Sequence, residues 1–306
     1  MAQWKLVRDI RRNPFSYLLV APAVIYAFIF GYMTLPYIVI AFKNYNFQKG
    51  IWGSPFVGLK NFMFFFGSNR ASLVTMNTIV LNVLYIGVGT LLAVGVALLM
   101  NEIAKSLFLK VSQSVLIFPN FLSWVIVSYI VFAIFSTDRG LLNGIMRAFG
   151  HKNVNWYASP QYWRTILTVI RVWKIFGINS VIFLSAITAI DEGLYEAARI
   201  DGATRFKQML HITLPLLAPT ICILTLMSVG KIFYGDFQMM YTIVGDNGLL
   251  MPVTDVIDTY VYRALRTTGD PSGAMAVGLY QAAVGFVMVF SSNLLVRKMF
   301  PEGALF

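Results

Sequence analysis

Six long apolar runs, separated by short polar segments, dominate this chain. A helix needs about 20 apolar residues to cross about 30 Å of hydrocarbon, and each run reaches that length. We therefore predict an all-α integral membrane protein whose 306 residues form a single transmembrane domain. The six predicted spans are approximately 17–42, 74–100, 111–135, 163–190, 213–244 and 275–296.

The composition agrees with a membrane protein. The chain is 58% hydrophobic and 12% charged, with a mean hydropathy of +0.71, whereas a soluble domain carries about twice that charged fraction. The formal net charge of +11 would suggest nucleic acid in a soluble protein, but here the basic residues are spread over short loops and form no stripe. Anchoring of these loops at an anionic membrane surface is the simpler explanation. We expect membrane lipid as a partner and no nucleic acid.

The N-terminal segment sets the predicted orientation. It carries Lys5, Arg8, Arg11 and Arg12 ahead of the first apolar run. That run is too long for the apolar region of a signal peptide and lacks a small-residue cleavage pattern, so we predict that it is retained as the first span. Basic residues on short loops favour the cytoplasmic side. This rule places both termini and the polar segment 191–212 in the cytoplasm.

That polar segment has strong local signals for helices and a turn. Asp191 and Thr204 can cap two short helices, over about 193–200 and 205–211, because their side-chain oxygens accept first-turn amides. Gly202 lies where a left-handed turn would end the first helix, and the proline-led apolar run that follows would start a third. Such a segment is either a solvated loop between two spans or a docking site for another protein.

The residue types that carry most enzyme chemistry are scarce. No P-loop is present, so the chain is not expected to bind ATP through that motif. Cys222 is the single cysteine, and His151 and His211 fall in different segments, which argues against a metal cluster or a histidine-based triad. The acidic residues are too scattered to suggest a catalytic carboxylate pair. We predict that the chain is not an enzyme and holds no metal or cofactor of its own.

Several charged and polar residues fall inside the apolar runs. A charge at the centre of a span costs at least about 2.5 kcal/mol, so such residues normally face a water-filled cavity or a partner. Arg171 and Lys174 are three residues apart and share a helix face, while Lys231 could reach Asp236 only if the helix were distorted near Gly235. These groups either tie helices together or line a substrate path. The predicted path residues are Asn120, Trp124, Arg171, Trp173, Lys174, Asn179, Lys231, Tyr234, Asp236 and Gln238.

One stretch resembles a known family. The residues that carry the resemblance are Glu196, Ala197, Ala198, Asp201, Gly202, Ala203, Ile212, Leu214 and Pro215. Together they are similar to the EAA loop of permease subunits in binding-protein-dependent ABC importers of the carbohydrate type. The stretches FVGLKNF (56–62), FPNFLSW (118–124), VWKIFG (172–177) and DVIDTYVYR (255–263) are similar to the lipoprotein and polysaccharide permease subgroup. The resemblance implies a type I ABC importer permease with a cytoplasmic coupling helix, in a bacterial cytoplasmic (inner) membrane.

The resemblance also implies an assembly. Such a permease works with a second, homologous permease, an external solute-binding protein, and two ATPase subunits that bind the ATP and Mg. The implied transport mechanism is alternating access, driven by ATP hydrolysis on those partners. The residues expected at the ATPase contact are Glu196, Ala197, Ala198, Asp201 and Gly202.

The implied substrate is an oligosaccharide or polysaccharide, and an acidic, uronate-containing one is the sharper hypothesis. Trp173 and Tyr234 could stack on sugar rings, and the cations of the fourth and fifth spans could attract carboxylates. Two alternatives stay open. An ion-coupled secondary transporter would use Asp236 as its intramembrane carboxylate, and a non-transporting scaffold or export component would keep the spans without coupling them to ATP.

Overall fold

The structure is a computed structural model, and it describes residues 12–103 and 107–299. Lys5, Arg8, Arg11 and Lys105 lie outside this part of the chain. The described residues form helices and turns, joined by two isolated β-bridges. In chain order these are α2 (Pro14–Ala27), η1 (Phe28–Tyr32), η2 (Leu35–Phe42), α3 (Gly50–Gly53), α4 (Lys60–Phe66), α5 (Asn69–Glu102), α6 (Leu107–Ile117), η3 (Phe118–Phe121), α7 (Trp124–Phe135), α8 (Leu141–Ala148), η4 (Trp156–Ala158), α9 (Pro160–Thr188), α10 (Glu192–Ile200), α11 (Arg205–Gln208), η5 (Met209–Thr213), α12 (Leu214–Val229), α13 (Phe237–Ile243), α14 (Met251–Thr254), α15 (Ile257–Arg266) and α16 (Pro271–Met299).

The predicted all-α membrane fold is confirmed. Among the described residues, five helices are long and apolar enough to cross a membrane, and a bent pair brings the number to six if it counts as one span. The five are Pro14–Phe42, Asn69–Glu102, Pro160–Thr188, Arg205–Val229 and Pro271–Lys298, and the bent pair is Leu107–Phe121 with Trp124–Phe135.

The third and fifth spans differ from the prediction because neither is a continuous helix. The third, predicted over 111–135, turns by 97° between α6 and α7. Pro119 has no amide to continue α6, and Ser123 starts a new helix by accepting the amide of Ile126 at 3.3 Å. The fifth, predicted to reach Val244, ends at Val229 and stays irregular until α13 begins at Phe237.

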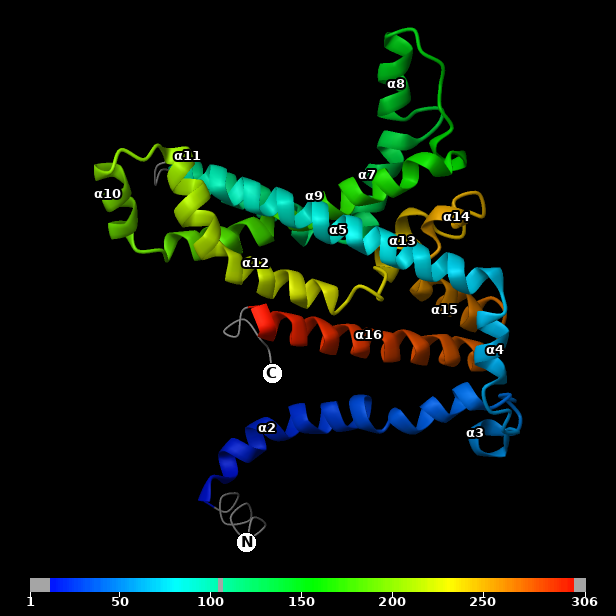
Figure 1. The fold of residues 1–306 in the computed structure, drawn as a ribbon. Helices are drawn as coiled ribbons and strands as arrows, with labels where there is room; N and C mark the ends of the chain where they lie inside the picture. The colour runs from blue at the N-terminus through cyan, green and yellow to red at the C-terminus, as the bar shows by residue number, and fades with distance from the viewer. Residues whose placement is uncertain (1–11, 104–106, 300–306) are drawn as a thin grey trace.

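The central pair of the bundle is α5 with α9, which pack along much of their length (Figure 1). The largest core cluster joins them to α7 and α13 through buried side chains that include Leu81, Trp124, Trp163 and Met239. The short helix α13 therefore packs against α7 and not in line with α12. Both interrupted spans pack against α9.

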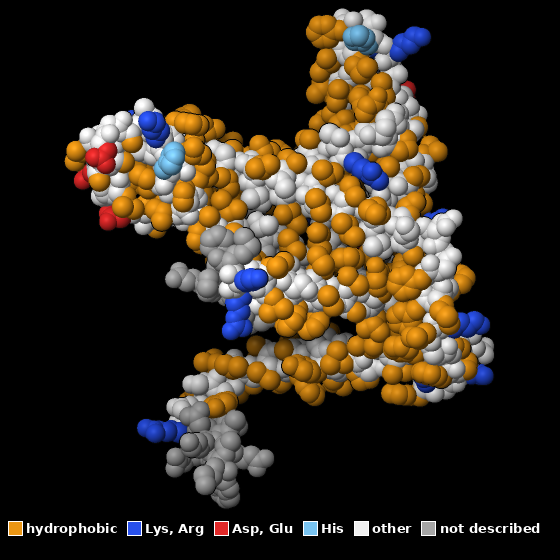
Figure 2. Space-filling view, in the orientation of Figure 1, with side chains coloured by type: hydrophobic (Ala, Val, Ile, Leu, Met, Phe, Trp, Pro, Cys, Tyr) orange, Lys and Arg blue, Asp and Glu red, His pale blue; other side chains and the backbone are white. Residues whose placement is uncertain are grey.

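The first span stands apart from the rest of the chain. Within the described segment Pro14–Ala27 no side chain is buried, and the main contact of the first span with α16 is made by η2 (Figure 1). Figure 2 shows apolar side chains across this helix and over the middle of the bundle, with the acidic ones gathered at the α10 end. An apolar surface of this extent needs lipid or another membrane protein to cover it.

The two ends of the bundle have different elements. α10 and α11 form one end, while α3, α4, α14 and α15 lie at the other (Figure 1). The start of α2 and the end of α16 lie on the α10 side, and α8 projects away from the bundle axis.

Candidate translocation path and coupling segment

The α10 segment folds locally as its residues predict. Asp191 accepts the amide of Gly193 at 3.0 Å, and Thr204 accepts that of Lys207 at 3.4 Å. Gly202 has φ +75°, a left-handed conformation that favours glycine. The prediction of a separate third helix is wrong, because α11 continues through the π-helical turn η5 into α12. The segment therefore consists of one capped helix and a sharp turn, followed by the start of the fifth-span helix, which begins earlier in the sequence than predicted.

The tip of this segment is free to meet another protein. Glu196, Ala197, Asp201 and Gly202 are exposed, while Ala198 is half-buried. The most exposed apolar side chain at the tip belongs to Ile200, which is 87% accessible. Ile200 was not among the residues predicted for a contact; in the sequence it is one large apolar residue at the end of a polar helix.

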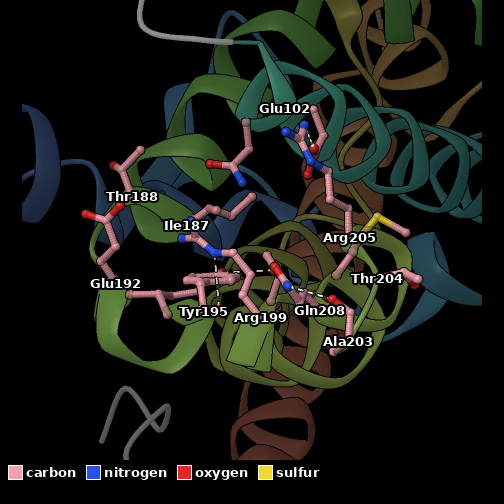
Figure 3. Close-up of a pocket in the computed structure, with 14 residues that line it drawn as sticks. Glu102, Ile187, Thr188, Glu192, Tyr195, Arg199, Ala203, Thr204, Arg205 and Gln208 are labelled. Carbon is pink, nitrogen blue, oxygen red and sulfur yellow. Dashed lines mark hydrogen bonds and ion pairs between the residues drawn. The ribbon is translucent and has the colours of Figure 1, made fainter. Parts of the chain in front are cut away.

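The coupling segment is joined to the bundle around a cavity of about 690 Å³ (Figure 3). The hydroxyls of Tyr195 and Thr213 lie 2.9 Å apart and link α10 to the start of the fifth span. Arg205 pairs with Glu102 at the end of α5, with nitrogen and oxygen 3.0 Å apart. The hydrogen bond therefore ties α10 to the start of the fifth span, and the ion pair ties α11, in the same start, to the end of α5.

The break after α12 is held by side chains from three other helices. Asn82 donates to the carbonyl of Ile232 at 3.0 Å, and Gln281 donates to that of Phe233 at 2.7 Å. The carboxylate of Asp258 accepts the amide of Gly235 at 2.6 Å. Irregular backbone at membrane depth is tolerated only where protein or a water-filled cavity satisfies it. Burial raises the pKa of the Asp258 carboxyl, and the bonds from Gly235 and Gln281 oppose that rise.

Lys174 holds the other break. Its ammonium donates to the carbonyls of Pro119, Asn120 and Leu122, at 3.3, 2.9 and 2.5 Å. A cation is favourable there because the C-terminal carbonyls of a helix carry partial negative charge. The lysine is buried, so its role here is to stabilise the turn between α6 and α7.

Gly177 allows α6 to approach α9 closely. A Cβ atom at this position would lie 1.8 Å from the carbonyl oxygen of Leu116, so no larger residue fits without displacing the backbone. The stretches FPNFLSW and VWKIFG are thus packing partners across the first break.

A cavity of about 570 Å³ lies between α5, α9, α12 and the irregular segment 230–236. Arg171 and Asp236 form an ion pair at its wall, with Nη1 and Oδ2 3.3 Å apart. Asp236 also caps α13 by accepting the amide of Met239 at 3.1 Å. The backbone is distorted near Gly235, as the pairing of Lys231 with Asp236 would require, but the structure pairs Asp236 with Arg171.

The structure brings half of the predicted path residues to this cavity. Arg171, Asn179, Lys231, Tyr234 and Asp236 line it, whereas Asn120, Trp124, Trp173, Lys174 and Gln238 are absent from its described lining. Trp124 lies under both cations, with its ring centre 5.9 Å from Arg171 and 5.2 Å from Lys174. Asn82 and Tyr85 also line the cavity; both are polar residues within the apolar run of the second span.

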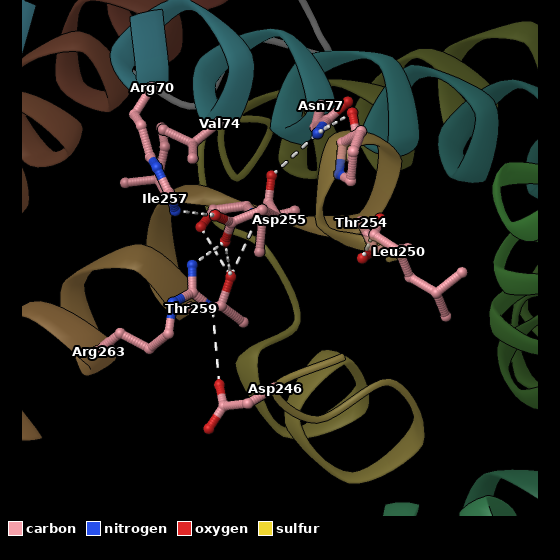
Figure 4. A network of polar contacts seen from close by, with 12 residues as sticks. Arg70, Val74, Asn77, Asp246, Leu250, Thr254, Asp255, Ile257, Thr259 and Arg263 are labelled. Atoms are coloured by element: carbon pink, nitrogen blue, oxygen red, sulfur yellow. Dashed lines mark hydrogen bonds and ion pairs between the residues drawn. The ribbon is translucent and has the colours of Figure 1, made fainter. Parts of the chain in front are cut away.

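A third polar cluster joins α5 to α15 at the end opposite α10 (Figure 4). The buried carboxylate of Asp255 accepts bonds from Thr259, at 2.8 Å, and Arg263. Arg263 also pairs with Asp246 at 3.8 Å, and Asn77 donates to the backbone carbonyl of Asp255 at 3.2 Å. These bonds connect α15 and the residue before it, Asp255, to α5. The DVIDTYVYR stretch therefore has a structural role.

With these features in place, comparison with known proteins decides the family. Residues 86–301 match the family described as the binding-protein-dependent transport system inner membrane component. The chain belongs to this family. It is a multi-pass membrane translocation subunit, and the predicted importer permease family is confirmed.

Individual relatives extend the match to almost the whole chain. A polygalacturonan/rhamnogalacturonan transport system permease protein of Bacillus subtilis is 36% identical, over 98% of this chain and 92% of its own length. Protein LplB of the same organism is 33% identical, over 96% of this chain and 92% of its own length. A chain from the crystal structure of a bacterial ABC transporter involved in import of the acidic polysaccharide alginate superposes with a TM-score of 0.88 at 30% identity, covering 97% of this chain and 99% of that one. The type I permease fold is therefore confirmed.

Proposed function

We propose that this permease carries an acidic oligosaccharide or polysaccharide from an external binding protein into the cytoplasm. The observation that carries the proposal is the cavity beside the irregular segment 230–236, whose wall contains Arg171 and Lys231. Arg171 has an ion pair with Asp236, and Lys231 has none among the described residues. Carboxylate groups of a uronate chain would pair with both cations through charge-assisted hydrogen bonds. The polygalacturonan permease and the alginate importer, both similar to this chain, are named for acidic polymers.

The energy for transport comes, in this proposal, from partner subunits. α10 would dock on an ATPase subunit that binds the ATP and Mg, with Glu196, Ala198 and Gly202 at the contact and Ile200 as an apolar anchor. The support is the exposed tip, the hydrogen bond from α10 to the start of the fifth span, and the ion pair from that start to α5. Closing of the ATPase pair would move α10 and switch the spans between inward and outward access.

The remaining partners would cover the other surfaces. A second permease would pack against part of the first span, whose described residues Pro14–Ala27 are all unburied, with lipid over the rest. A solute-binding protein would rest on the end that holds α3, α4, α14 and α15. One solved structure similar to this chain is of an alginate transporter in complex with a pentasaccharide-bound periplasmic protein. This arrangement puts α10 and both chain ends in the cytoplasm.

An ion-coupled transporter is less well supported. It would need a carboxylate that is free to bind a proton or a cation within the membrane. Asp236 was the candidate, and it is engaged by Arg171 and by the first turn of α13.

Uptake by the reconstituted complex tests the substrate class. A galacturonate trisaccharide and its methyl ester have the same backbone and differ in charge, so we would compare their uptake with Arg171→Ala against the unaltered protein. We expect a loss of about tenfold for the acid, since one charged hydrogen bond contributes about 1.5 kcal/mol, and little change for the ester. Arg70→Ala is the control, because Arg70 is 61% exposed and lies outside this cavity. An equal loss for both sugars, or none, would contradict an acidic substrate.

A further inference from the structure

We propose that Asp236 is an internal carboxylate that occupies Arg171 in the resting protein and is displaced by a carboxylate of the entering substrate. The inference rests on the proposed function, because it takes an acidic saccharide as the ligand. It assigns Asp236 a regulatory role at the cavity, beyond the path and ion-coupling roles that the sequence suggested.

The geometry makes the exchange possible. Nη1 of Arg171 and Oδ2 of Asp236 are 3.3 Å apart, and both residues line the 570 Å³ cavity. Their side chains remain 28% and 19% exposed, so a ligand in the cavity can reach the pair. A guanidinium has five N–H donors and binds a free carboxylate with two parallel bonds. A uronate carboxylate can therefore replace the single contact that Asp236 makes with the guanidinium.

A second cation at the cavity, Lys231, explains why an acidic ligand would enter in preference to a neutral one. Lys231 lines the same cavity, and no ion pair is found for it among the described residues. With Arg171 neutralised by Asp236, Lys231 supplies the attraction that brings an acidic chain into the cavity. Once the substrate carboxylate has taken Arg171, the two cations face the ligand together.

The position of Asp236 links this exchange to the coupling segment. Asp236 ends the irregular segment that follows α12, and the helix from Arg205 to Val229 runs unbroken from that segment back to α11. The bonds that Asn82 and Gln281 donate to the backbone do not involve Asp236, so opening the ion pair does not require breaking them. The pair thus stabilises one packing of the fifth span against α9, and a ligand that breaks it shifts the population toward the other.

ATP hydrolysis by the reconstituted complex without substrate tests the inference. Asp236→Asn keeps an oxygen to cap α13 and removes the charge that holds Arg171. We expect basal hydrolysis to rise about fivefold, which corresponds to about 1 kcal/mol. Arg171→Ala removes the same pair and should raise it equally. The double variant should then rise no further than either single one, because the two residues act through one contact.

Asp258→Asn is the matched control, because it also weakens the attachment of segment 230–236 but leaves the ion pair with Arg171 in place. Asp258 holds the same segment through the amide of Gly235 and does not pair with Arg171. Its effect on basal hydrolysis should be the same with and without Arg171→Ala. Unchanged hydrolysis in Asp236→Asn, or additive rises in the double variant, would overturn the inference. The uptake assay tests the substrate class separately, since it measures how Arg171→Ala changes uptake of the acid and of the ester relative to the unaltered protein.

Discussion

Three cations of the fourth and fifth spans show how context sets the role of a charge at membrane depth. Lys174 is buried and bonds backbone carbonyls, Arg171 pairs with Asp236, and Lys231 lines the cavity. The sequence places Arg171 and Lys174 on one helix face, which is correct. It cannot show that one of them satisfies a broken helix while the other reaches a cavity, because that depends on where the partner backbone is interrupted.

Comparing Lys174→Met with Lys231→Met tests which cation stabilises the fold and which binds substrate. Lys174→Met leaves carbonyls of Pro119, Asn120 and Leu122 without their donor, and one charged hydrogen bond contributes about 1.5–3 kcal/mol. We expect a lower apparent melting temperature for the purified complex and a smaller folded fraction. Lys231→Met is the comparison: it should keep the melting temperature and reduce uptake of the acidic trisaccharide. Equal melting temperatures for the two variants would refute the structural role of Lys174.

At the scale of elements, local rules succeeded where the chain is polar and failed where it is apolar. The cap residues Asp191 and Thr204 and the turn at Gly202 were predictable because each acts on its immediate neighbours. The breaks at Pro119 and Gly230 were not, since hydropathy is the same for a straight span and a bent one. What stabilises those breaks comes from α5, α9, α15 and α16, which are distant in sequence.

Gly202→Asp tests the turn that aims α10. At φ +75° a side chain strains the backbone, and a reoriented α10 would no longer follow the ATPase. We expect the protein to insert and the complex to hydrolyse ATP, with uptake reduced severalfold. The control is Gly150→Asp, a glycine at φ +77° with nothing within 4 Å of its Cβ position, as at Gly202. Gly150→Asp should show any loss of insertion that backbone strain alone causes, and its uptake should stay coupled to ATP hydrolysis. Normal uptake in Gly202→Asp would show that the turn does not couple the permease to the ATPase.

At the scale of the whole molecule, the two ends of the bundle differ in how they are attached to its long helices. α10 is joined to the bundle around a cavity, whereas the cluster at Asp255 fixes α15 to α5. A movement imposed at α10 can therefore reach the cavity at Arg171 and Asp236 without loosening the opposite end. Such an asymmetry suits the proposed transporter, in which ATPase subunits act at α10 and the substrate is delivered at the opposite end.

The orientation of these ends can be measured by labelling single cysteines. Cys222 is the only cysteine of the chain, so Cys222→Ser provides a clean background. Lys49→Cys, on the exposed surface beside α3, should react with a membrane-impermeant maleimide in intact spheroplasts. Glu196→Cys in α10 should react only after permeabilisation, because positive loop charge favours the cytoplasmic side.

Lys298→Cys, exposed near the end of α16, reports the α10 side from a position away from the proposed ATPase contact. It should follow Glu196→Cys even if a bound ATPase shields α10. If Lys298→Cys reacted in intact spheroplasts and Lys49→Cys did not, α10 would face outward. An outward-facing α10 could not reach a cytoplasmic ATPase, so that result would contradict the proposed ATPase contact. It would leave the pairing of Arg171 with Asp236 unaffected, because that contact does not depend on the orientation.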